Sequence, residues 1–361
     1  MTNMDIADFS YDLPHELIAQ TPIEPRDSSR LLVLHRGSGL IEHRHFRDIG
    51  AYLRPGDLLV ANQSRVLPAR LLGVKEDSGG RAEVLLLAIR SDLGTDYWEA
   101  LVRPGRRLRA GQRIVFADGA LTAEIFDRTP SGGRIVHLAA GAGSVAEAIA
   151  RVGAVPLPPY IHTPLADAER YQTVYARAPG SAAAPTAGLH FTPELLAALM
   201  TQGIDMATVT LHIGLDTFRP IGEEDLEEHV MHSEEIELDA EAADKINATR
   251  ESEGRIVAVG TTSVRVLESV AAFTEEKRQS GELADSDALV TAWRGRTSLF
   301  LRPGSPFRAV DVMITNFHLP RSTLLVLVSA FAGRELTLRA YEEAVAERYR
   351  FYSFGDAMLI L

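Results

Sequence analysis

The stretch that decides the fold is RAEVLLLAIRSDLGTDYWEALVRPGRRLRAGQRIVF, residues 81–116. The pairs Pro104-Gly105 and Ala110-Gly111 punctuate it, and such pairs favour turns. Five strand-like runs lie in this stretch or just after it: residues 81–89, 97–102, 113–116, 121–126 and 134–138. Because no segment between them has room for a helix, the spacing predicts a small antiparallel β-barrel or sandwich.

The sequence on both sides of this region has a different pattern of apolar residues. Short apolar runs at residues 31–34 and 58–60 are typical of buried strands. After residue 150, strands are expected at residues 206–215, 255–260 and 310–318, alternating with helices at residues 193–202, 240–252, 263–278 and 336–348. Alternation of this kind predicts an α/β domain. We therefore expect an α/β domain, residues 1–62 and 151–361, interrupted by an inserted antiparallel β-barrel domain, residues 63–150.

Composition narrows the possible functions. The 361 residues include no cysteine, which excludes disulfides, thiolate catalysis and Cys-ligated metal sites. The first residues carry no positive charge and no apolar core of a signal peptide, and the apolar stretch at residues 322–333 is too short to span a bilayer. These features predict a cytoplasmic protein with no membrane association.

Charge is unevenly distributed along the chain. The formal net charge is −12, which argues against a general nucleic-acid coat protein. Residues 62–150 contain 12 Lys and Arg against 10 Asp and Glu, whereas the rest contains 25 against 39. Five arginines fall within eleven residues of this segment: Arg103, Arg106, Arg107, Arg109 and Arg113. They form either a solvated hairpin or a contact to nucleic-acid phosphates.

Polar residues follow two of the predicted core strands. The run GTTSVR, residues 260–265, places a glycine turn and hydroxyls at a helix start, which serves either as an ordinary cap or as a carboxylate or phosphate site. Asn316 and His318 follow another strand. Because ligands of open α/β sheets bind at the carboxyl ends of strands, Thr261, Asn316 and His318 could share one crevice. His212 could line it, or could be a core histidine with satisfied hydrogen bonds.

A loop of small residues, APTAGLHFT at residues 184–192, precedes a helix that Thr192 caps with Pro193 in its first turn. Small residues let a backbone approach a ligand closely, so a ligand loop containing His190 is favoured over a purely structural cap.

Two other motifs suggest competing functions. His229, His232 and Glu234 could bind a metal, but no H-E-x-x-H motif is present, so hydrogen-bonding or acid/base histidines are favoured. Gly141-Ala-Gly143 matches part of a dinucleotide fingerprint. The following segment is Pro-rich rather than a second parallel strand, so a glycine-rich exit from the barrel into a helix is favoured.

Taken in order, the motifs resemble one family, the S-adenosylmethionine:tRNA ribosyltransferase-isomerases of queuosine biosynthesis. The matching stretches run nearly from end to end: FSYDLP (9–14), LIAQTP (17–22), VLPAR (66–70), PLPPYI (156–161), RYQTVY (170–175), APTAGLHFT (184–192), TFRP (217–220), EHVMHSE (228–234), GTTSVR (260–265), ITNFHLP (314–320) and YRFYSFGDAM (349–358). The chain departs from the family pattern at three positions. Gln63 stands where the family usually has Asp, Asp216 where it has Gly, and Arg302 where an aromatic is common.

The resemblance implies the fold already expected and also a reaction. The ribosyl part of S-adenosyl-L-methionine is transferred to 7-aminomethyl-7-deazaguanine at the wobble position of tRNA and isomerised, giving epoxyqueuosine-tRNA, adenine and methionine. S-adenosyl-L-methionine is the ribosyl donor, no metal is expected, and the enzyme is expected to be a monomer.

This chemistry needs a base to remove a proton next to the sulfonium and an acid to help adenine leave, which histidine can supply near neutral pH. The catalytic candidates are His190, His212, His229, His232 and His318, with His190 and His229 favoured. The candidate substrate contacts are Asn62, Arg65, Thr186, Gly188, Phe191, Thr192, Phe218, Glu234, Thr261, Thr262, Arg265, Asn316 and Phe317. The candidate tRNA contacts are the five arginines at positions 103, 106, 107, 109 and 113.

Three alternatives stay open at this stage. One is a nucleic-acid-binding barrel protein without chemistry, which would not bind S-adenosylmethionine. Another is a metal-dependent hydrolase that uses His229, His232 and Glu234. The last is a dinucleotide oxidoreductase built on Gly141 and Gly143.

Overall fold

A computed structural model describes residues 4–90, 92–105, 108–129, 132–214, 226, 231, 233–283 and 287–361. The chain divides into two compact units. One comprises Met1–Ser64, Pro159–Ala178 and Ala184–Leu361, and we call it the sheet unit. The other comprises Arg65–Pro158 and Pro179–Ala183, and we call it the barrel unit.

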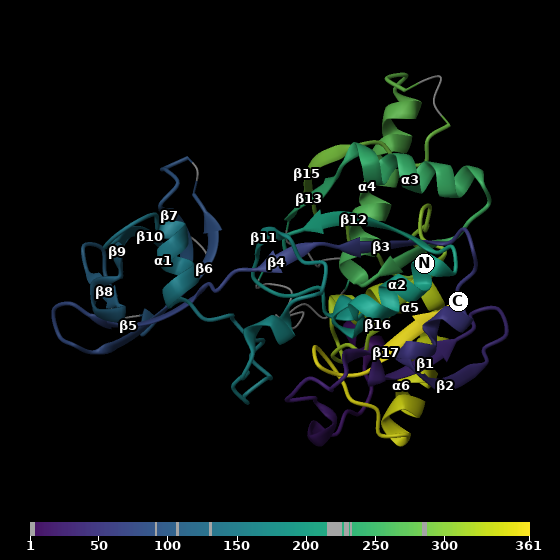
Figure 1. The fold of residues 1–361 in the computed structure, drawn as a ribbon, viewed down its shortest axis with the longest axis horizontal. Coiled ribbons are helices and arrows are strands. Elements are labelled where there is room, and N and C mark those ends of the chain that lie inside the picture. Colours follow the sequence, from purple (N-terminus) through teal and green to yellow (C-terminus); the bar gives the residue numbers. More distant parts are fainter. Residues whose placement is uncertain are drawn as a thin grey trace. The chain divides into compact units, whose positions relative to one another are not determined.

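The barrel unit contains the predicted antiparallel barrel. Its strands are β5 Arg70–Lys75, β6 Arg81–Ile89, β7 Tyr97–Arg103, β8 Arg113–Phe116, β9 Leu121–Arg128 and β10 Arg134–Ala140, and they close in the order β10-β7-β6-β5-β8-β9 (Figure 1). Helix α1, Val145–Val152, packs Ala148 and Ile149 into the barrel core. Ser144 caps α1 through a capping box with Glu147, which confirms the structural interpretation of the glycine-rich segment before it.

The sheet unit is built on one mixed sheet. Its strands are β1 Arg30–Leu34, β2 Ile41–His45, β3 Leu58–Asn62, β12 Asp205–Leu211, β13 Glu234–Leu238, β14 Ile256–Val259, β15 Trp293–Thr297, β16 Val312–Asn316 and β17 Ala357–Ile360. They run in the order β15-β13-β12-β3-β14-β16-β17-β1-β2. The four strands β12, β3, β14 and β16 are mutually parallel. A two-stranded pair, β4 Ser64–Val66 with β11 Ala178–Ser181, lies where the chain passes between the units.

Helices cover both faces of the central sheet. They are α2 Pro193–Thr201, α3 Ala240–Glu251, α4 Thr261–Gln279, α5 Thr323–Ala332 and α6 Arg334–Ala346. Short 3₁₀ helices are Ile6–Phe9, His15–Leu17, Arg26–Ser28, Phe46–Ala51, Ala117–Gly119, Ala168–Tyr171 and Thr186–His190. None of the helices that can be described is long and apolar enough to cross a membrane.

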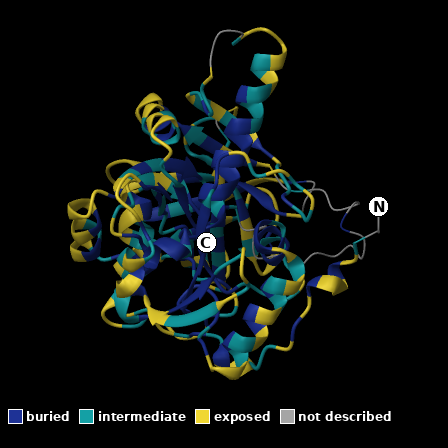
Figure 2. Cartoon of the chain, turned by 90° about the vertical axis from the view of Figure 1, so that its right-hand side faces the viewer, coloured by how far each residue is buried: buried dark blue, intermediate teal, exposed yellow. Residues whose placement is uncertain are grey.

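Strand alternation decides which side chains meet which helices. Alternate residues of the central strands, such as Leu59, Val257 and Ile314, form one core cluster with α2 and the 3₁₀ helices Phe46–Ala51 and Thr186–His190. Helices α3 and α4 contact β3, β12 and β14. Figure 2 shows the buried residues gathered along the strands and the exposed ones on the surrounding helices and loops.

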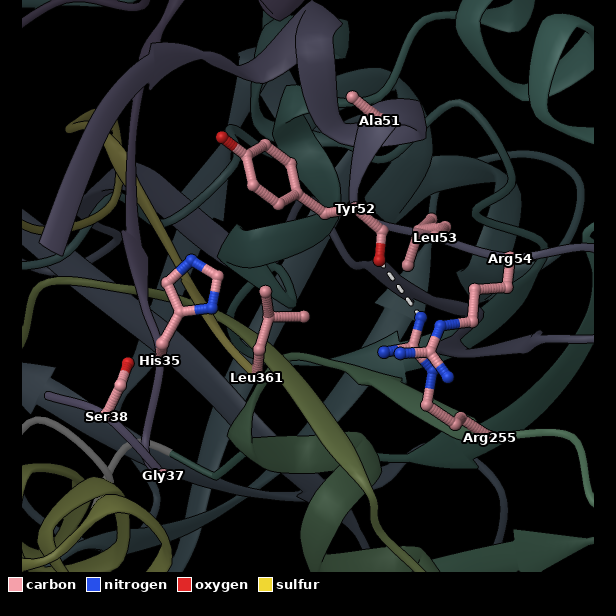
Figure 3. Close-up of a pocket in the computed structure, with 9 residues that line it drawn as sticks. All are labelled: His35, Gly37, Ser38, Ala51, Tyr52, Leu53, Arg54, Arg255 and Leu361. Atoms are coloured by element: carbon pink, nitrogen blue, oxygen red, sulfur yellow. Dashed lines mark hydrogen bonds between the residues drawn. The ribbon is translucent and has the colours of Figure 1, made fainter. Parts of the chain in front are cut away.

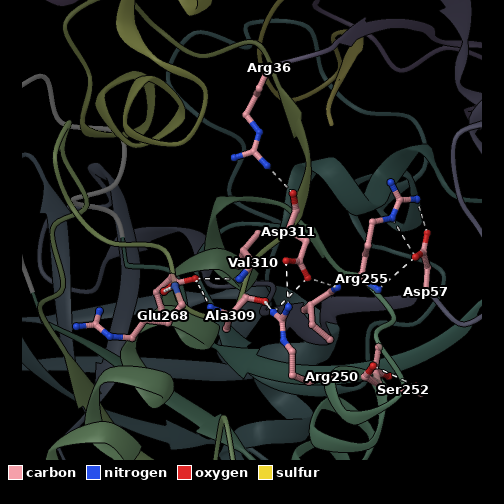
Figure 4. A network of polar contacts seen from close by, with 12 residues as sticks. Arg36, Asp57, Arg250, Ser252, Arg255, Glu268, Ala309, Val310 and Asp311 are labelled. Carbon is pink, nitrogen blue, oxygen red and sulfur yellow. Dashed lines mark hydrogen bonds and ion pairs between the residues drawn. The ribbon is translucent and has the colours of Figure 1, made fainter. Parts of the chain in front are cut away.

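Three carboxylates, of which Asp57 and Glu268 are buried and Asp311 is half-buried, fix the edge at which β3, β14 and β16 begin (Figure 4). Asp57 pairs with the guanidinium of Arg255 at 2.6 Å, and Asp311 accepts the backbone N–H of Ile256 at 2.8 Å. Glu268 accepts backbone N–H groups of residues 308–310, among them Val310 at 3.0 Å. All three carboxylates are therefore engaged in positioning the starts of the strands.

A cavity of about 530 Å³ lies at the same edge (Figure 3). Its lining includes His35, which follows β1, as well as Tyr52, Arg54 and Arg255, which precede β3 and β14. Tyr52 and His35 both hydrogen-bond Glu42, at 3.3 Å and 2.8 Å. This cavity is thus at the edge opposite to the carboxyl ends of the parallel strands.

Candidate functional site

The carboxyl ends of the four parallel strands form one edge, as the sequence predicted. Asn62 and Asn316 are the last residues of β3 and β16, and Gly260 joins β14 to α4 with a φ of 88°. A Cβ at Gly260 would lie 3.5 Å from the methyl group of Ala187, so the loop Thr186–His190 packs directly against the start of α4. The loop and the helix start are therefore parts of one site.

His190 is buried at this site, and both of its ring nitrogens are engaged. Nδ1 lies 2.7 Å from Oγ of Ser29, and Nε2 lies 3.2 Å from Nδ2 of Asn316. Nδ2 of Asn316 also donates to the carbonyl of Tyr352 at 3.1 Å, which fixes the orientation of the amide. It follows that Nε2 of His190 accepts, and that Nδ1 carries the proton and donates to Ser29.

The surroundings keep the His190 ring neutral. The ring is only 4% exposed and stacks on Phe46 with 5.0 Å between centroids. Burial, reinforced by the positive charges of Arg26 and Arg350, lowers the pKa of His190 to about 3. A neutral ring with both nitrogens occupied is suited to positioning its neighbours, and Asn316 in particular.

The segment at residues 170–175 lies over the same loop. A Cβ at Gly188 would overlap the hydroxyl oxygen of Tyr175 and would approach the methyl group of Thr173 to 2.8 Å. The hydroxyls of Thr173 and Tyr175 are buried without a hydrogen-bond partner in the part of the chain that can be described. In the sequence this segment matches the family, but neither residue was predicted to belong to the site. No sequence pattern reveals that a hydroxyl group is buried.

Helix α4 begins at this edge without a side-chain cap, since its N-cap residue is Gly260. Thr261 is buried at the first helical position, and Oγ1 of Thr262 is buried with no partner among the described residues. Oγ of Ser263, by contrast, donates to the carbonyl of Val259 at 2.8 Å. The uncapped start therefore combines backbone N–H groups with an unused hydroxyl, an arrangement that suits a carboxylate or phosphate.

Arg265, one turn into α4, forms a buried ion pair with Glu234, the first residue of β13. The other carboxylate oxygen of Glu234 accepts the N–H of Gly214 at 3.2 Å, and Nε of Arg265 donates to the carbonyl of Leu299 at 3.3 Å. Nη2 of Arg265 is buried and has no partner within the described ranges. Arg265 also lines a small cavity with Leu299 and Phe300.

Two further histidines lie at the carboxyl edge. Nε2 of His318 lies 2.8 Å from Oγ1 of Thr315, and burial lowers the pKa of His318 to about 3. His212 follows β12 and is half-buried, and its Nδ1 is buried without a partner among the described atoms. Burial also lowers the pKa of His212, against the opposing effect of Glu235 and Glu237.

Four predicted substrate contacts have partners within the chain. The amide of Asn62 bridges β3 to β12, donating to the carbonyl of Leu211 at 2.9 Å and accepting its N–H at 3.1 Å. Thr192 caps α2 through the N–H of Leu195. Phe191 packs against Phe46 in the core. Phe317 lies in a cluster of aromatic rings with Tyr341, Tyr349 and Phe351.

Gln63, one of the departures from the family pattern, holds Arg177. Its amide oxygen accepts from Nε of Arg177, whose Nη2 donates to Oγ1 of Thr208 at 2.9 Å. A carboxylate at position 63 would make the same contact as an ion pair. The position thus anchors β3 to the neighbouring chain segment.

The remaining candidates lie elsewhere or outside the described residues. Thr186 opens the 3₁₀ helix Thr186–His190, and Arg65 belongs to the barrel unit. Arg103, Arg109 and Arg113 are exposed on the barrel unit. The residues that cannot be placed are His229, His232, Phe218, Asp216, Arg106 and Arg107.

The alternative metal site of His229, His232 and Glu234 has lost one of its three possible ligands. Glu234 is committed to Arg265 and Gly214. Within the described part of the chain, no group of three or more His, Asp or Glu side chains could hold a metal ion.

Comparison with known proteins identifies the family. The family model described as "Queuosine biosynthesis protein" matches residues 6–360. The S-adenosylmethionine:tRNA ribosyltransferase-isomerase of Symbiobacterium thermophilum is 57% identical over 99% of this chain and 100% of its own length, and that of Moorella thermoacetica is 54% identical over the same shares. The crystal structure of S-adenosylmethionine tRNA ribosyltransferase from Thermotoga maritima, 40% identical, superposes with a TM-score of 0.54 over 98% of this chain and 100% of that one. The chain therefore belongs to the queuosine biosynthesis protein family.

Proposed function

We propose that this chain is an S-adenosylmethionine:tRNA ribosyltransferase-isomerase. It transfers the ribosyl part of S-adenosylmethionine to 7-aminomethyl-7-deazaguanine at the wobble position of tRNA and isomerises it, releasing adenine and methionine. Relatives of this name that match over their whole length support the proposal. The alternatives, a barrel protein without chemistry, a metal hydrolase and an oxidoreductase, find no support in these relatives.

One observation carries the assignment of the site. Five buried polar atoms that have no partner among the described residues lie on the segments around the carboxyl edge, although others, such as Trp98 Nε1 and Arg250 Nε, lie elsewhere: they are Thr173 Oγ1, Tyr175 Oη, Thr262 Oγ1, Arg265 Nη2 and Asn316 Oδ1. Buried polar groups in native proteins are almost always hydrogen-bonded, so this concentration marks the place that a polar ligand fills. S-adenosylmethionine, with its carboxylate, ammonium, ribose hydroxyls and adenine, supplies partners for all of these atoms.

The methionine carboxylate of the donor is assigned to the start of α4. Its negative charge suits the free N–H groups there, and Thr262 and Nη2 of Arg265 supply two further donors. Glu234 neutralises the remaining charge of Arg265 and holds its side chain in place. Oδ1 of Asn316, oriented by His190, can accept an N–H of the substrate.

The catalytic base is assigned to His212 among the described histidines. The sulfonium makes the adjacent 5′ C–H acidic, and a base must remove that proton. Nδ1 of His212 has no partner among the described residues, and the lowered pKa of His212 keeps the ring unprotonated at neutral pH. His190 is assigned a positioning role because both of its nitrogens are occupied. His229 and His232 remain candidates for the acid that protonates adenine.

We expect tRNA to contact the arginines at positions 103, 106, 107, 109 and 113, and we expect the enzyme to act as a monomer in the cytoplasm. Light scattering coupled to size-exclusion chromatography, run with and without tRNA, tests the monomer. A stable dimer that persists on dilution would contradict it.

The decisive experiment incubates the protein with S-adenosylmethionine and precursor-bearing tRNA and measures free adenine. The variant His212→Gln should release adenine about 10²–10⁴ times more slowly, as expected for loss of a general base, with an unchanged melting temperature. No adenine from the unmodified protein would refute the function. Normal turnover by His212→Gln would refute only the assignment of the base.

A further inference from the structure

A groove of about 740 Å³ lies on the outer surface of the barrel unit, between β5 and the end of β8. The two strands pair only at Val74–Val115 and Lys75–Ile114. Beyond that point β8 ends at Phe116, and the chain turns away through Ala117 and Asp118. The groove therefore opens where the two strands separate.

The floor of this groove is apolar and exposed. Leu72 and Val74 point outward from β5, with 60% and 43% of their surface exposed, and Val115 lies opposite Val74. Gly73 faces inward, where its missing side chain leaves space for the ring of Phe116. Exposed apolar side chains that line a concave surface, rather than being scattered singly, indicate a binding surface.

Arginines rim this floor. The strand register places Val74 beside Arg81, and Leu72 beside Glu83, which in turn lies opposite Arg103. Glu83 forms an ion pair with Arg70 at 2.9 Å, and Arg70, which is not part of the lining, neutralises its charge. Neither Arg81 nor Arg103 makes an ion pair with any residue that is described, and Asp118 is the other carboxylate of the lining.

The barrel has a second exposed apolar feature that serves as a contrast. Phe126 on β9 is 50% exposed and packs edge-on against Tyr97, which lies against His137. The strand positions around it carry Glu99, Glu124 and Asp127 together with Arg128, so carboxylates outnumber arginines there. A negatively charged partner is thus disfavoured on that face and favoured at the groove.

We propose that the groove between β5 and β8 binds one unstacked nucleotide of the substrate tRNA. Its base lies on Leu72, Val74 and Val115, and Arg81 and Arg103 contact the flanking phosphates. Single-stranded RNA is commonly recognised by splayed bases that stack on aromatic rings or guanidinium planes, with phosphates held by arginines; in this groove the aliphatic side chains and the two guanidinium groups would take that role. The inference rests on the proposed function, because that function makes tRNA the partner.

The absence of cysteine from the sequence gives a direct test. Leu72→Cys introduces a single thiol into the groove, and Phe126→Cys introduces one on the contrasting face. Both variants are labelled with a maleimide in the presence and absence of saturating tRNA. Protection of Leu72→Cys with no protection of Phe126→Cys is the expected result. Equal labelling of Leu72→Cys with and without tRNA overturns the proposal.

Charge-reversal variants distinguish binding in the groove from general electrostatic attraction of tRNA to the barrel unit. Arg81→Glu and Arg103→Glu should each weaken tRNA binding about tenfold or more and lower the salt slope of log K by about 1. The matched variant Arg128→Glu, at an exposed position on β9, should have a much smaller effect. S-adenosylmethionine binding should be the same in all of them. Equal losses of tRNA binding in all three variants would overturn the proposal.

These outcomes are distinguishable from failure of the proposed function. If the unmodified protein neither binds tRNA nor releases adenine, the function itself is wrong. If it does both while Leu72→Cys stays unprotected, only the groove assignment is wrong. Protection of Leu72→Cys that rises with protein concentration in the absence of tRNA would instead identify a contact between copies of the chain and overturn the proposal.

Discussion

The side-chain amide of Asn316 donates a hydrogen bond to Nε2 of His190, with 3.2 Å between the two nitrogens. Because the carbonyl of Tyr352 fixes the same amide group, His190 must accept at Nε2, and its ring is held in one neutral form. The ring in turn keeps Oδ1 of Asn316 free for a ligand. We therefore infer that His190, which the sequence favoured as a catalytic residue, has a positioning role and orients Asn316.

This relationship predicts a pH dependence of stability. In the unfolded chain the pKa of His190 is about 6.5, but in the folded protein it is lowered to about 3. At pH values between these two pKa values, the unfolded state binds more protons than the folded state. The stability that His190 contributes is therefore complete above the unfolded pKa and is lost as the pH falls. The loss is at most about 1.4 kcal/mol per pH unit. Urea unfolding of the unmodified protein and of His190→Gln, from pH about 7 to about 5, should show their difference shrinking as pH falls.

The control for that series is His15→Gln, at an exposed position in the same unit. Its unfolding free energy should follow that of the unmodified protein at every pH. If the difference between the unmodified protein and His190→Gln is the same at both ends of the range, His190 is not held neutral and the hydrogen-bond assignment is wrong.

Two neighbouring hydroxyls on α4 should have opposite effects when removed. Thr262→Val removes a buried hydroxyl that has no partner among the described residues, so stability should stay the same or rise by about 1 kcal/mol, while S-adenosylmethionine binding weakens about tenfold. Ser263→Ala removes the bond to the carbonyl of Val259, so it should cost about 1 kcal/mol and leave binding unchanged. Calorimetry of binding and thermal unfolding check both. Unchanged binding by Thr262→Val would remove Thr262 from the site.

The buried ion pair of Glu234 and Arg265 couples stability to binding. Glu234→Gln leaves a buried guanidinium without its counter-charge and should cost about 3–5 kcal/mol. The double variant Glu234→Gln with Arg265→Met should regain much of that stability, since no isolated charge remains. It should still bind S-adenosylmethionine poorly, because the guanidinium is gone. Recovery of binding together with stability would show that Arg265 has only a structural role.

Much of the fold was predictable because its local signals agree with its tertiary contacts. The strand at residues 81–89 was predicted with the same bounds as β6, since apolar residues of the strand face one core, and the helix expected after the glycine-rich exit from the barrel is α1. The carboxyl-edge argument also predicted that Thr261, Asn316 and His318 lie together at the ends of their strands, and β14 and β16 do end side by side there.

The elements that were missed lack such signals. Strand β2 reads IEHRH and is mostly polar because it lies at the edge of the sheet. Helix α5 reads TLLVLVSAFA and is apolar on nearly all sides, so it has no helical periodicity. Glu234 is a charged residue that is nevertheless buried, because Arg265, 31 positions away, provides the counter-charge. Contacts at that separation leave no local pattern.

The contact between Gly188 and Tyr175 gives the last prediction. A methyl group at position 188 would overlap the Tyr175 hydroxyl, so Gly188→Ala should displace the loop Thr186–His190, cost about 1–3 kcal/mol and slow adenine release. Adding Tyr175→Phe removes the overlapping oxygen, so the double variant should recover part of the lost stability. Its turnover should stay low, because the hydroxyl assigned to the ligand is absent. If Gly188→Ala alone has normal stability and turnover, the loop is more tolerant than its packing implies, and Tyr175 does not constrain the position of His190.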